Sequence, residues 1–188
     1  MLDCRLKEID SADMRLMLLR HAKAEKAQGR MRDRDRPLNG RGRMDATEIA
    51  AYMASRALLP ERVIVSSAER TRETWAHMAP AFSSATAVDY QDRLYDAAPD
   101  TIVSVIKAAG GNAAVLMVIG HNPGLHDAAR LLLAHRGGTA HQLDDGLPTA
   151  GLVVIDFAED DWRRVAARSG RLKGFVTPRL LHLAKDNE

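Results

Sequence analysis

Uninterrupted apolar runs alternate along the chain with stretches in which apolar residues recur every three or four positions. Continuous apolar runs are typical of strands covered on both faces, and the second spacing is typical of amphipathic helices. The runs at 14–20 and 113–119 therefore predict two central strands. The β-branched run at 62–66 predicts a third strand, and 85–90 predicts an edge strand.

Helical spacing predicts four helices between these strands, over 42–58, 67–80, 99–109 and 124–134. The second helix follows Ser67, and serine favours the N-cap position. The third has Pro99 in its first turn and Gly110 just beyond its end, which matches the usual start and stop residues of helices.

The C-terminal third of the chain carries shorter patterns. Residues 149–157 and 162–167 predict a pair of antiparallel strands joined by a turn at 158–161, and 172–177 forms a last apolar element. Together the elements predict an α/β protein, a three-layer α/β/α sandwich with a mostly parallel central sheet. We expect a single domain over 14–184, preceded by a polar N-terminal tail at 1–13.

Composition narrows the class of protein. The 188 residues are 46% hydrophobic and 28% charged, as in a globular domain with its own core. A net charge of +2, with cations and acids interspersed, argues against a nucleic-acid partner. No segment approaches the roughly 20 apolar residues of a membrane helix. Cys4 is the single cysteine, and the tail lacks a signal-peptide pattern, so we expect a cytoplasmic protein.

Three of the predicted strands lead into residues suited to bind an anion. Arg20 ends the first strand and His21 follows it, His121 and Asn122 follow the strand at 113–119, and Arg70 lies in the first turn of the helix after 62–66. Arginine suits a phosphoryl oxyanion, and histidine suits a nucleophile or proton carrier. Each motif alone is as easily a surface turn. Because parallel strands end at one edge of a sheet, their combination predicts a shared anion pocket.

The segment 22–39 predicts a long, highly charged loop directly after His21. Loops longer than about 12 to 15 residues are often functional. Its carboxylates at Asp33 and Asp35 are candidates to reach back over the pocket, as a proton donor or as a partner of an arginine. A mixed-charge loop that is simply solvated is the alternative.

Taken in order, Arg20-His21, then Ser66 with Arg70 and Thr74, then Gly120-His121-Asn122-Pro123-Gly124 resemble the histidine phosphatase superfamily. The segment 33–38, followed by Arg41-Gly42, looks most like the small SixA-type phosphohistidine phosphatases. The resemblance spans 15–133 and implies a phosphoglycerate-mutase-like fold. It also implies that His21 becomes phosphorylated, that the phosphoryl group is surrounded by Arg20, Arg70 and His121 with Asn122 nearby, and that no metal or other cofactor is needed.

The residue types fit that chemistry. Fixed cationic donors stabilise the charge on a phosphoryl group in transfer. Nearby cations favour the neutral imidazole of His21, and its second ring nitrogen needs an acceptor such as a backbone carbonyl. We expect two steps, in which His21 takes the phosphoryl group and water then releases phosphate.

Two positions depart from the family pattern. Ala22 stands where the broader superfamily has glycine, so its methyl group is expected to restrict the backbone or narrow the pocket mouth. Many relatives use a glutamate proton donor after the third strand, and 92–96 contains none. Asp33 is the first substitute, followed by Asp35 and Asp92. A phosphohistidine leaving group needs little help from an acid, so the absence of any donor also fits that substrate.

Three functions stay open from the sequence. The first is a phosphatase acting on phosphohistidine in a protein, the second is a phosphatase of a small phosphate ester or nucleotide, and the third is a noncatalytic phosphoprotein-binding module. The intact His21 argues against the third function. Few aromatic residues, about 4%, and no inserted cap favour a bulky substrate over a small enclosed one. The remaining histidines lack acidic or cysteine neighbours at ligand spacing, so no metal site is predicted.

Overall fold

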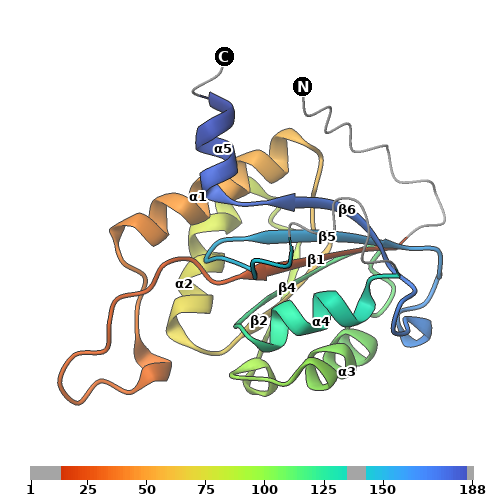
Figure 1. Cartoon of the computed structure of the whole chain (residues 1–188), viewed down its shortest axis with the longest axis horizontal. Helices are drawn as coiled ribbons and strands as arrows, with labels where there is room; N and C mark the ends of the chain where they lie inside the picture. Colours follow the sequence, from red (N-terminus) through yellow and green to blue (C-terminus); the bar gives the residue numbers. More distant parts are fainter. Residues whose placement is uncertain (1–13, 135–142, 186–188) are drawn as a thin grey trace.

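A computed structural model describes residues 14–134 and 143–185, and places one sheet between two layers of helices (Figure 1). The tail predicted at 1–13 lies outside the described residues. The strands are β1 (Met14–Arg20), β2 (Arg62–Ser66), β3 (Ala87–Gln91), β4 (Val115–Gly120), β5 (Leu152–Phe157) and β6 (Arg171–Val176). Their order is β3-β2-β4-β1-β5-β6, with β1 to β4 mutually parallel and β5 antiparallel to both of its neighbours. The predicted mostly parallel α/β/α sandwich is confirmed.

The helices divide between the two faces of the sheet (Figure 1). One face is covered by α1 (Gly40–Ser55), α2 (Glu69–Met78) and the short α5 (Pro178–Lys185); the other is covered by α3 (Pro99–Ala109) and α4 (Gly124–Leu132). Short 3-10 helices interrupt the connections: η1 (Asp33–Asp35), η2 (Ala79–Ala81), η3 (Asp92–Leu94) and η5 (Trp162–Arg164). Within the described ranges, no helix has the length and apolar character to cross a membrane.

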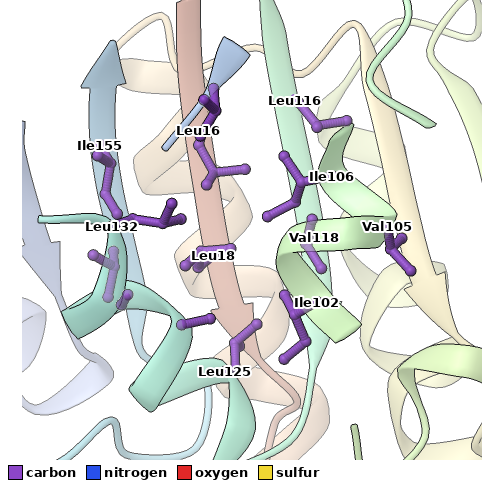
Figure 2. Packing of buried hydrophobic residues seen from close by; sticks show 14 of the residues in the cluster. Leu16, Leu18, Ile102, Val105, Ile106, Leu116, Val118, Leu125, Leu132 and Ile155 are labelled. Atoms are coloured by element: carbon purple, nitrogen blue, oxygen red, sulfur yellow. The ribbon is translucent and has the colours of Figure 1, made fainter. Parts of the chain in front are cut away.

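Burial on both faces of the sheet explains why the apolar run of β1 is continuous. Leu16 and Leu18 pack with the core between the sheet and helices α3 and α4 (Figure 2), and Met17 and Leu19 pack with the core on the α1 and α2 face. All four side chains are fully buried. Alternate side chains of a strand point to opposite faces, so a strand between two helix layers needs apolar residues at every position. The arrangement fixes the end of β1, and hence His21, in the middle of the sheet.

A charged pair is buried between the central strands β1 and β5. Arg15 on β1 lies opposite Asp156 on β5, and its Nε and Nη2 donate to the two carboxylate oxygens at 2.7 and 2.8 Å. Lys173 of β6 adds a cation 3.6 Å from the same carboxylate. Pairs that satisfy each other in two hydrogen bonds are tolerated inside a protein, whereas a lone buried charge is not. The pair therefore favours the observed register of β1 against β5.

The predicted strand at 162–167 is wrong. Its first residues form η5, and β5 pairs instead with β6, the element left open at 172–177. Trp162 is buried, donates its Nε1 hydrogen to the carbonyl of Ala113 at 2.7 Å, and lies edge-on to Phe157. The apolar pattern at 162–167 therefore reflects in part the side chain of Trp162, which η5 places in the core. The sequence pattern did not predict the helix α5 that follows β6.

The starts of two helices also differ from prediction, and α1, α2 and α4 end two or three residues before their predicted ends. Helix α1 begins at Gly40, two residues early, because the side chain of Asn39 accepts from the backbone N–H of Gly42 at 2.8 Å. Helix α2 begins at Glu69, and its N-cap is Ala68 rather than a serine. The Ser67 hydroxyl is instead bound by the guanidinium of Arg34, which belongs to the long loop. Ser67 therefore binds a distant segment of the chain and does not cap α2.

Candidate active site

The carboxyl ends of β1 and β4 bring two histidines together. Arg20 lies opposite Gly120 in the parallel register, and the backbone N–H of His21 still donates to the Gly120 carbonyl at 3.1 Å. His21 and His121 each follow the end of one of these adjacent strands. Their ring centroids lie 5.2 Å apart, and both residues are buried. The sequence-based expectation that the two histidines leave the same edge of the sheet is met.

A cavity of about 560 Å³ opens over this edge. It is lined by Arg20, His21, Lys23, Ala24, Asp33, Arg36, Arg70, Tyr95, Asp96, His121, Asn122 and Thr149. All six predicted site residues are among them. The other two acid candidates, Asp35 and Asp92, are not; they pair with Arg32 and Arg34 at the surface. In the described parts of the chain, no three His, Cys, Asp or Glu side chains are grouped to hold a metal ion.

The imidazole of His21 is held in one orientation. Its Nδ1 lies 2.8 Å from the carbonyl of Ala22, which assigns the proton to Nδ1 and leaves the Nε2 lone pair available. Burial, with smaller contributions from the cations of Arg70 and Arg20, lowers the pKa of His21 to about 4, although the Ala22 hydrogen bond acts in the opposite direction. The imidazole is therefore neutral near pH 7. The sequence argument credited the cations alone, whereas burial is the larger cause.

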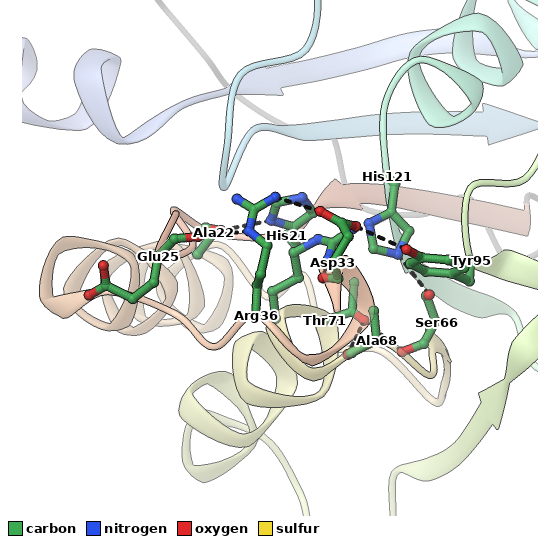
Figure 3. A network of polar contacts seen from close by, with 11 residues as sticks. His21, Ala22, Glu25, Asp33, Arg36, Ser66, Ala68, Thr71, Tyr95 and His121 are labelled. Carbon is green, nitrogen blue, oxygen red and sulfur yellow. Dashed lines mark hydrogen bonds and ion pairs between the residues drawn. The ribbon is translucent and has the colours of Figure 1, made fainter. Parts of the chain in front are cut away.

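His121 is fixed from two sides. Its Nε2 lies 2.7 Å from the hydroxyl oxygen of Ser66 at the end of β2, and the ring of Tyr95 meets it edge-on at 5.6 Å (Figure 3). Burial, followed by the neighbouring His21 and Arg70, lowers the pKa of His121 to about 3. Its Nδ1 is buried and, among the described residues, has no hydrogen-bond partner. Unpaired buried polar atoms are rare in structural positions and are more typical of functional sites.

The arginines enter the cavity from separate elements. Arg20, at the end of β1, donates from Nη1 to the carbonyl of Leu147 at 2.8 Å, and burial lowers its pKa. Arg70 comes from the first turn of α2, where it is 7% exposed although it is charged. It donates to the backbone carbonyl of Asp33 at 2.7 Å and to the Asp33 carboxylate at 3.0 Å. Helix α2 contributes this side chain alone to the cavity lining.

The carboxylate of Asp33 is the centre of a polar network at the cavity mouth (Figure 3). It accepts hydrogen bonds from Arg36 at 2.7 Å, from the Tyr95 hydroxyl at 2.9 Å and from Arg70 at 3.0 Å. The Arg36 hydrogen bond, followed by those of its other partners, lowers the pKa of Asp33 to about 2. The carboxylate is thus ionised near pH 7. In this arrangement it balances the charge of the arginines.

Sequence reasoning missed five residues of the lining that carry polar groups: Lys23, Arg36, Tyr95, Asp96 and Thr149. Arg36 lies inside the segment that carried the SixA resemblance, so its position beside Asp33 was a usable signal. Tyr95 lies in the loop that was searched only for a glutamate. Its contact with Asp33 joins residues 62 positions apart, and local patterns do not report such a distance.

The methyl group of Ala22 does not narrow the pocket, contrary to the expectation. The residue is fully buried, packs in the core on the α1 and α2 face, and is absent from the cavity lining. Its backbone N–H donates to the hydroxyl of Thr74 at 3.1 Å, and that hydroxyl in turn donates to the carbonyl of Arg70. The methyl group that Ala22 carries in place of the family's glycine is accommodated in the core. Thr74 ties the end of β1 to α2.

Comparisons with known proteins found a family model, curated relatives and solved structures. The model of the histidine phosphatase superfamily (branch 1) matches residues 16–99. An uncharacterised protein of Mycobacterium tuberculosis is 34% identical over 169 residues, which cover 86% of this chain and all of the relative. The crystal structure of a candidate phosphohistidine phosphatase SixA from Agrobacterium tumefaciens is 34% identical, with a TM-score of 0.74 over 88% of this chain and 98% of that one. The structure of a candidate phosphohistidine phosphatase SixA from Nakamurella is 26% identical, with a TM-score of 0.77 over 88% of this chain and 96% of that one.

Proposed function

Because the chain belongs to the histidine phosphatase superfamily, we propose that it is a protein phosphohistidine phosphatase that carries the phosphoryl group transiently on His21. One observation carries the proposal. A buried, neutral imidazole is held by the Ala22 carbonyl and faces a cavity that also contains Arg20 and Arg70. A neutral imidazole with one free lone pair is a nucleophile, and fixed guanidinium groups are suited to phosphoryl oxygens.

In the first step, Nε2 of His21 attacks phosphorus in line with the substrate P–N bond. The new P–N bond forms as the old one breaks, and the departing imidazole of the substrate keeps the bonding pair. Charge on the equatorial oxygens is stabilised by Arg20 and Arg70, with Arg36 and His121 nearby. In the second step, water attacks the phosphoryl group on His21, the P–N bond breaks towards Nε2, and inorganic phosphate leaves.

Asp33 has a place in this scheme that depends on the substrate. Near pH 7 it is ionised and occupied by Arg36, Arg70 and Tyr95. An incoming phosphoryl dianion competes for Arg70 and repels the carboxylate, and both effects raise the pKa of Asp33. The carboxyl group then becomes a proton donor for a poor leaving group such as an alkoxide. A departing imidazole can be protonated by water, so it needs this donor less.

Two features favour phosphohistidine in a protein over a small phosphate ester. The cavity is open, and no inserted segment of the described chain encloses it. The solved structure of 34% identity is named as a candidate phosphohistidine phosphatase. A small phosphate ester is the alternative substrate class, and a noncatalytic phosphoprotein-binding module is the second alternative.

The test compares turnover of a phosphohistidine peptide, a phosphoserine peptide, p-nitrophenyl phosphate and a sugar phosphate by wild type, His21→Ala and Asp33→Asn. We expect phosphohistidine to be preferred, His21→Ala to be inactive, and acid-labile label to be trapped on wild type after brief exposure to a labelled donor. Asp33→Asn should lose alkyl phosphate hydrolysis and keep phosphohistidine hydrolysis. Full activity of His21→Ala would refute the covalent route, and a preference for the sugar phosphate would refute the substrate class.

A further inference from the structure

A second cavity adjoins the candidate active site. It measures about 550 Å³ and lies between α5, the end of β6, the start of α1 and the loop before β5. We name it the α5 groove; its lining is Arg41, Asp145, Gly146, Pro148, Thr149, Phe175, Thr177, Pro178, Arg179, Leu180 and Leu183. Figure 1 shows α5 following β6 and lying beside α1. The groove is more apolar than the candidate active site.

The wall between the two cavities is built from a short segment that active-site residues hold in place. The carbonyl of Leu147 accepts from Arg20 Nη1 and from Asn122 Nδ2, both at 2.8 Å. Three residues later, the backbone N–H of Ala150 donates to the carbonyls of Arg20 and His21. Thr149, between these anchors, lines both cavities. Thr149 therefore forms a wall that the two cavities share.

The groove presents exposed apolar side chains. Leu180 and Leu183 are 41% and 49% exposed, although Leu181 between them packs against the core. Residues three apart lie on the same side of a helix, so both leucines form one exposed stripe of α5. Phe175 and Pro148 continue this surface towards the site. Contiguous exposed apolar surface at the edge of a pocket is typical of a binding surface.

The charges of the groove favour an acidic occupant. Arg41 and Asp145 line the groove with Arg179, and Arg41 also faces Asp45 at 3.6 Å; among the described residues, Arg179 is therefore the arginine of the groove that has no ion-pair partner. Arg179 is exposed on the first turn of α5, next to Leu180. An acidic side chain beside an apolar one therefore matches this end of the groove.

We propose that the α5 groove binds the polypeptide that flanks the phosphohistidine of a protein substrate, with an apolar side chain on Leu180 and an acidic side chain beside Arg179. The inference rests on the proposed function and adds the sequence that the enzyme prefers around the phosphorylated residue. A small phosphate ester fits within the first cavity and gains nothing from the second. A polypeptide reaches both, because it continues beyond the phosphorylated side chain.

The experiment measures kcat and KM of the full-length protein for three sets of phosphohistidine peptides. Leu and Glu flank the phosphohistidine in the first set, Leu and Lys in the second, and Gly and Ser in the third, with each flank placed on either side. The variants are Arg179→Glu and Leu180→Ser. Matched controls are Arg130→Glu and Leu59→Ser, which change an exposed arginine and an exposed leucine outside the groove. p-Nitrophenyl phosphate reports the chemistry without a flanking chain.

Wild type should prefer Leu-Glu peptides to Gly-Ser peptides by about three- to tenfold in kcat/KM, through KM. Arg179→Glu should reverse the order of the Leu-Glu and Leu-Lys sets, and Leu180→Ser should remove the advantage of leucine. Both variants should leave p-nitrophenyl phosphate turnover and kcat unchanged, and the control variants should behave as wild type.

Hydrolysis of all three sets with equal kcat/KM would overturn the groove assignment and leave the phosphohistidine function standing. The groove assignment would also be overturned if Leu180→Ser alters only the mass of the protein in light scattering, since the groove would then join two copies of this chain. Hydrolysis of p-nitrophenyl phosphate without hydrolysis of any phosphohistidine peptide would instead refute the proposed function, and the groove assignment with it.

Discussion

The two facing histidines should make the protein lose stability in a narrow window of mildly acidic pH. Burial lowers the pKa of His21 to about 4 and that of His121 to about 3, from an ordinary value of 6.5. As the pH falls below 6.5, the unfolded chain therefore takes up two protons that the folded protein does not. The free energy of unfolding falls in that direction, because protons bind preferentially to the unfolded state.

The size of the effect follows from the two shifts. Between the ordinary pKa and about pH 5 lie roughly 1.5 pH units, and each unit costs about 1.4 kcal/mol per proton. Each histidine thus contributes about 2 kcal/mol, and the pair about 4 kcal/mol, a large part of the stability of a typical domain. Asp33 does not contribute to the change in stability between pH 7 and pH 5. Because its pKa is lowered from an ordinary value of 3.8, its effect on the free energy of unfolding is confined to more acidic pH.

The assay is urea unfolding of wild type, His21→Gln and His121→Gln at several values between pH 7 and pH 5. Each variant should lose about half of the pH dependence, whatever its stability at pH 7. His77→Gln, which changes a histidine of α2 outside the cavity, is the matched control and should keep the full dependence. A wild-type change below about 0.5 kcal/mol, or equal slopes in wild type and both cavity variants, would show that burial does not hold these imidazoles neutral.

Three further predictions concern the frame of the site. Asp156→Val should lower the free energy of unfolding by about 3 to 5 kcal/mol, and the double variant with Arg15→Leu should recover most of the loss in urea unfolding, because the lone buried cation is then gone. Gly42→Ala should lower the free energy of unfolding by about 1 to 3 kcal/mol, and Gly40→Ala should leave it almost unchanged in thermal unfolding. The reason is that a Cβ added at Gly42 overlaps the backbone carbonyl of Lys23, whereas a Cβ added at Gly40 meets no atom. Ser66→Ala should lower kcat about fivefold and leave KM unchanged in steady-state assays, because His121 loses the hydroxyl that orients it. A fivefold rise of KM would instead indicate a general loss of structure.

The central sheet could be predicted from the sequence because its signal is local. Every position of β1 is apolar between its two arginines, and this follows from burial on both faces rather than from any distant contact. Arg20, His21 and His121 could be placed together for a related reason, since parallel strands that end at one edge bring their following residues together. No knowledge of the loops was needed.

The parts that were missed depend on contacts between distant segments. Trp162 gives a strand-like apolar pattern, but it belongs to the short helix η5 and its buried ring packs edge-on against Phe157. The contact of Tyr95 with Asp33 depends on how two loops fold back over the sheet. Spacing along the chain carries no information on either arrangement. The choice between Asp33, Asp35 and Asp92 as residues near the pocket therefore needed the three-dimensional arrangement of the loops.

The attachment of His21 to the centre of the sheet has a consequence for how this protein can change over generations. Its backbone N–H and carbonyl are both bound across neighbouring segments, so its amide should exchange with solvent only when the whole sheet opens. Asp33 and Arg36 lie on a surface loop, whose amides should exchange through small local openings. Substitutions in that loop can accumulate and alter which molecules are admitted, while the strand that holds His21 stays intact. The nucleophile and the charged loop at the cavity mouth therefore lie on separable pieces of one chain.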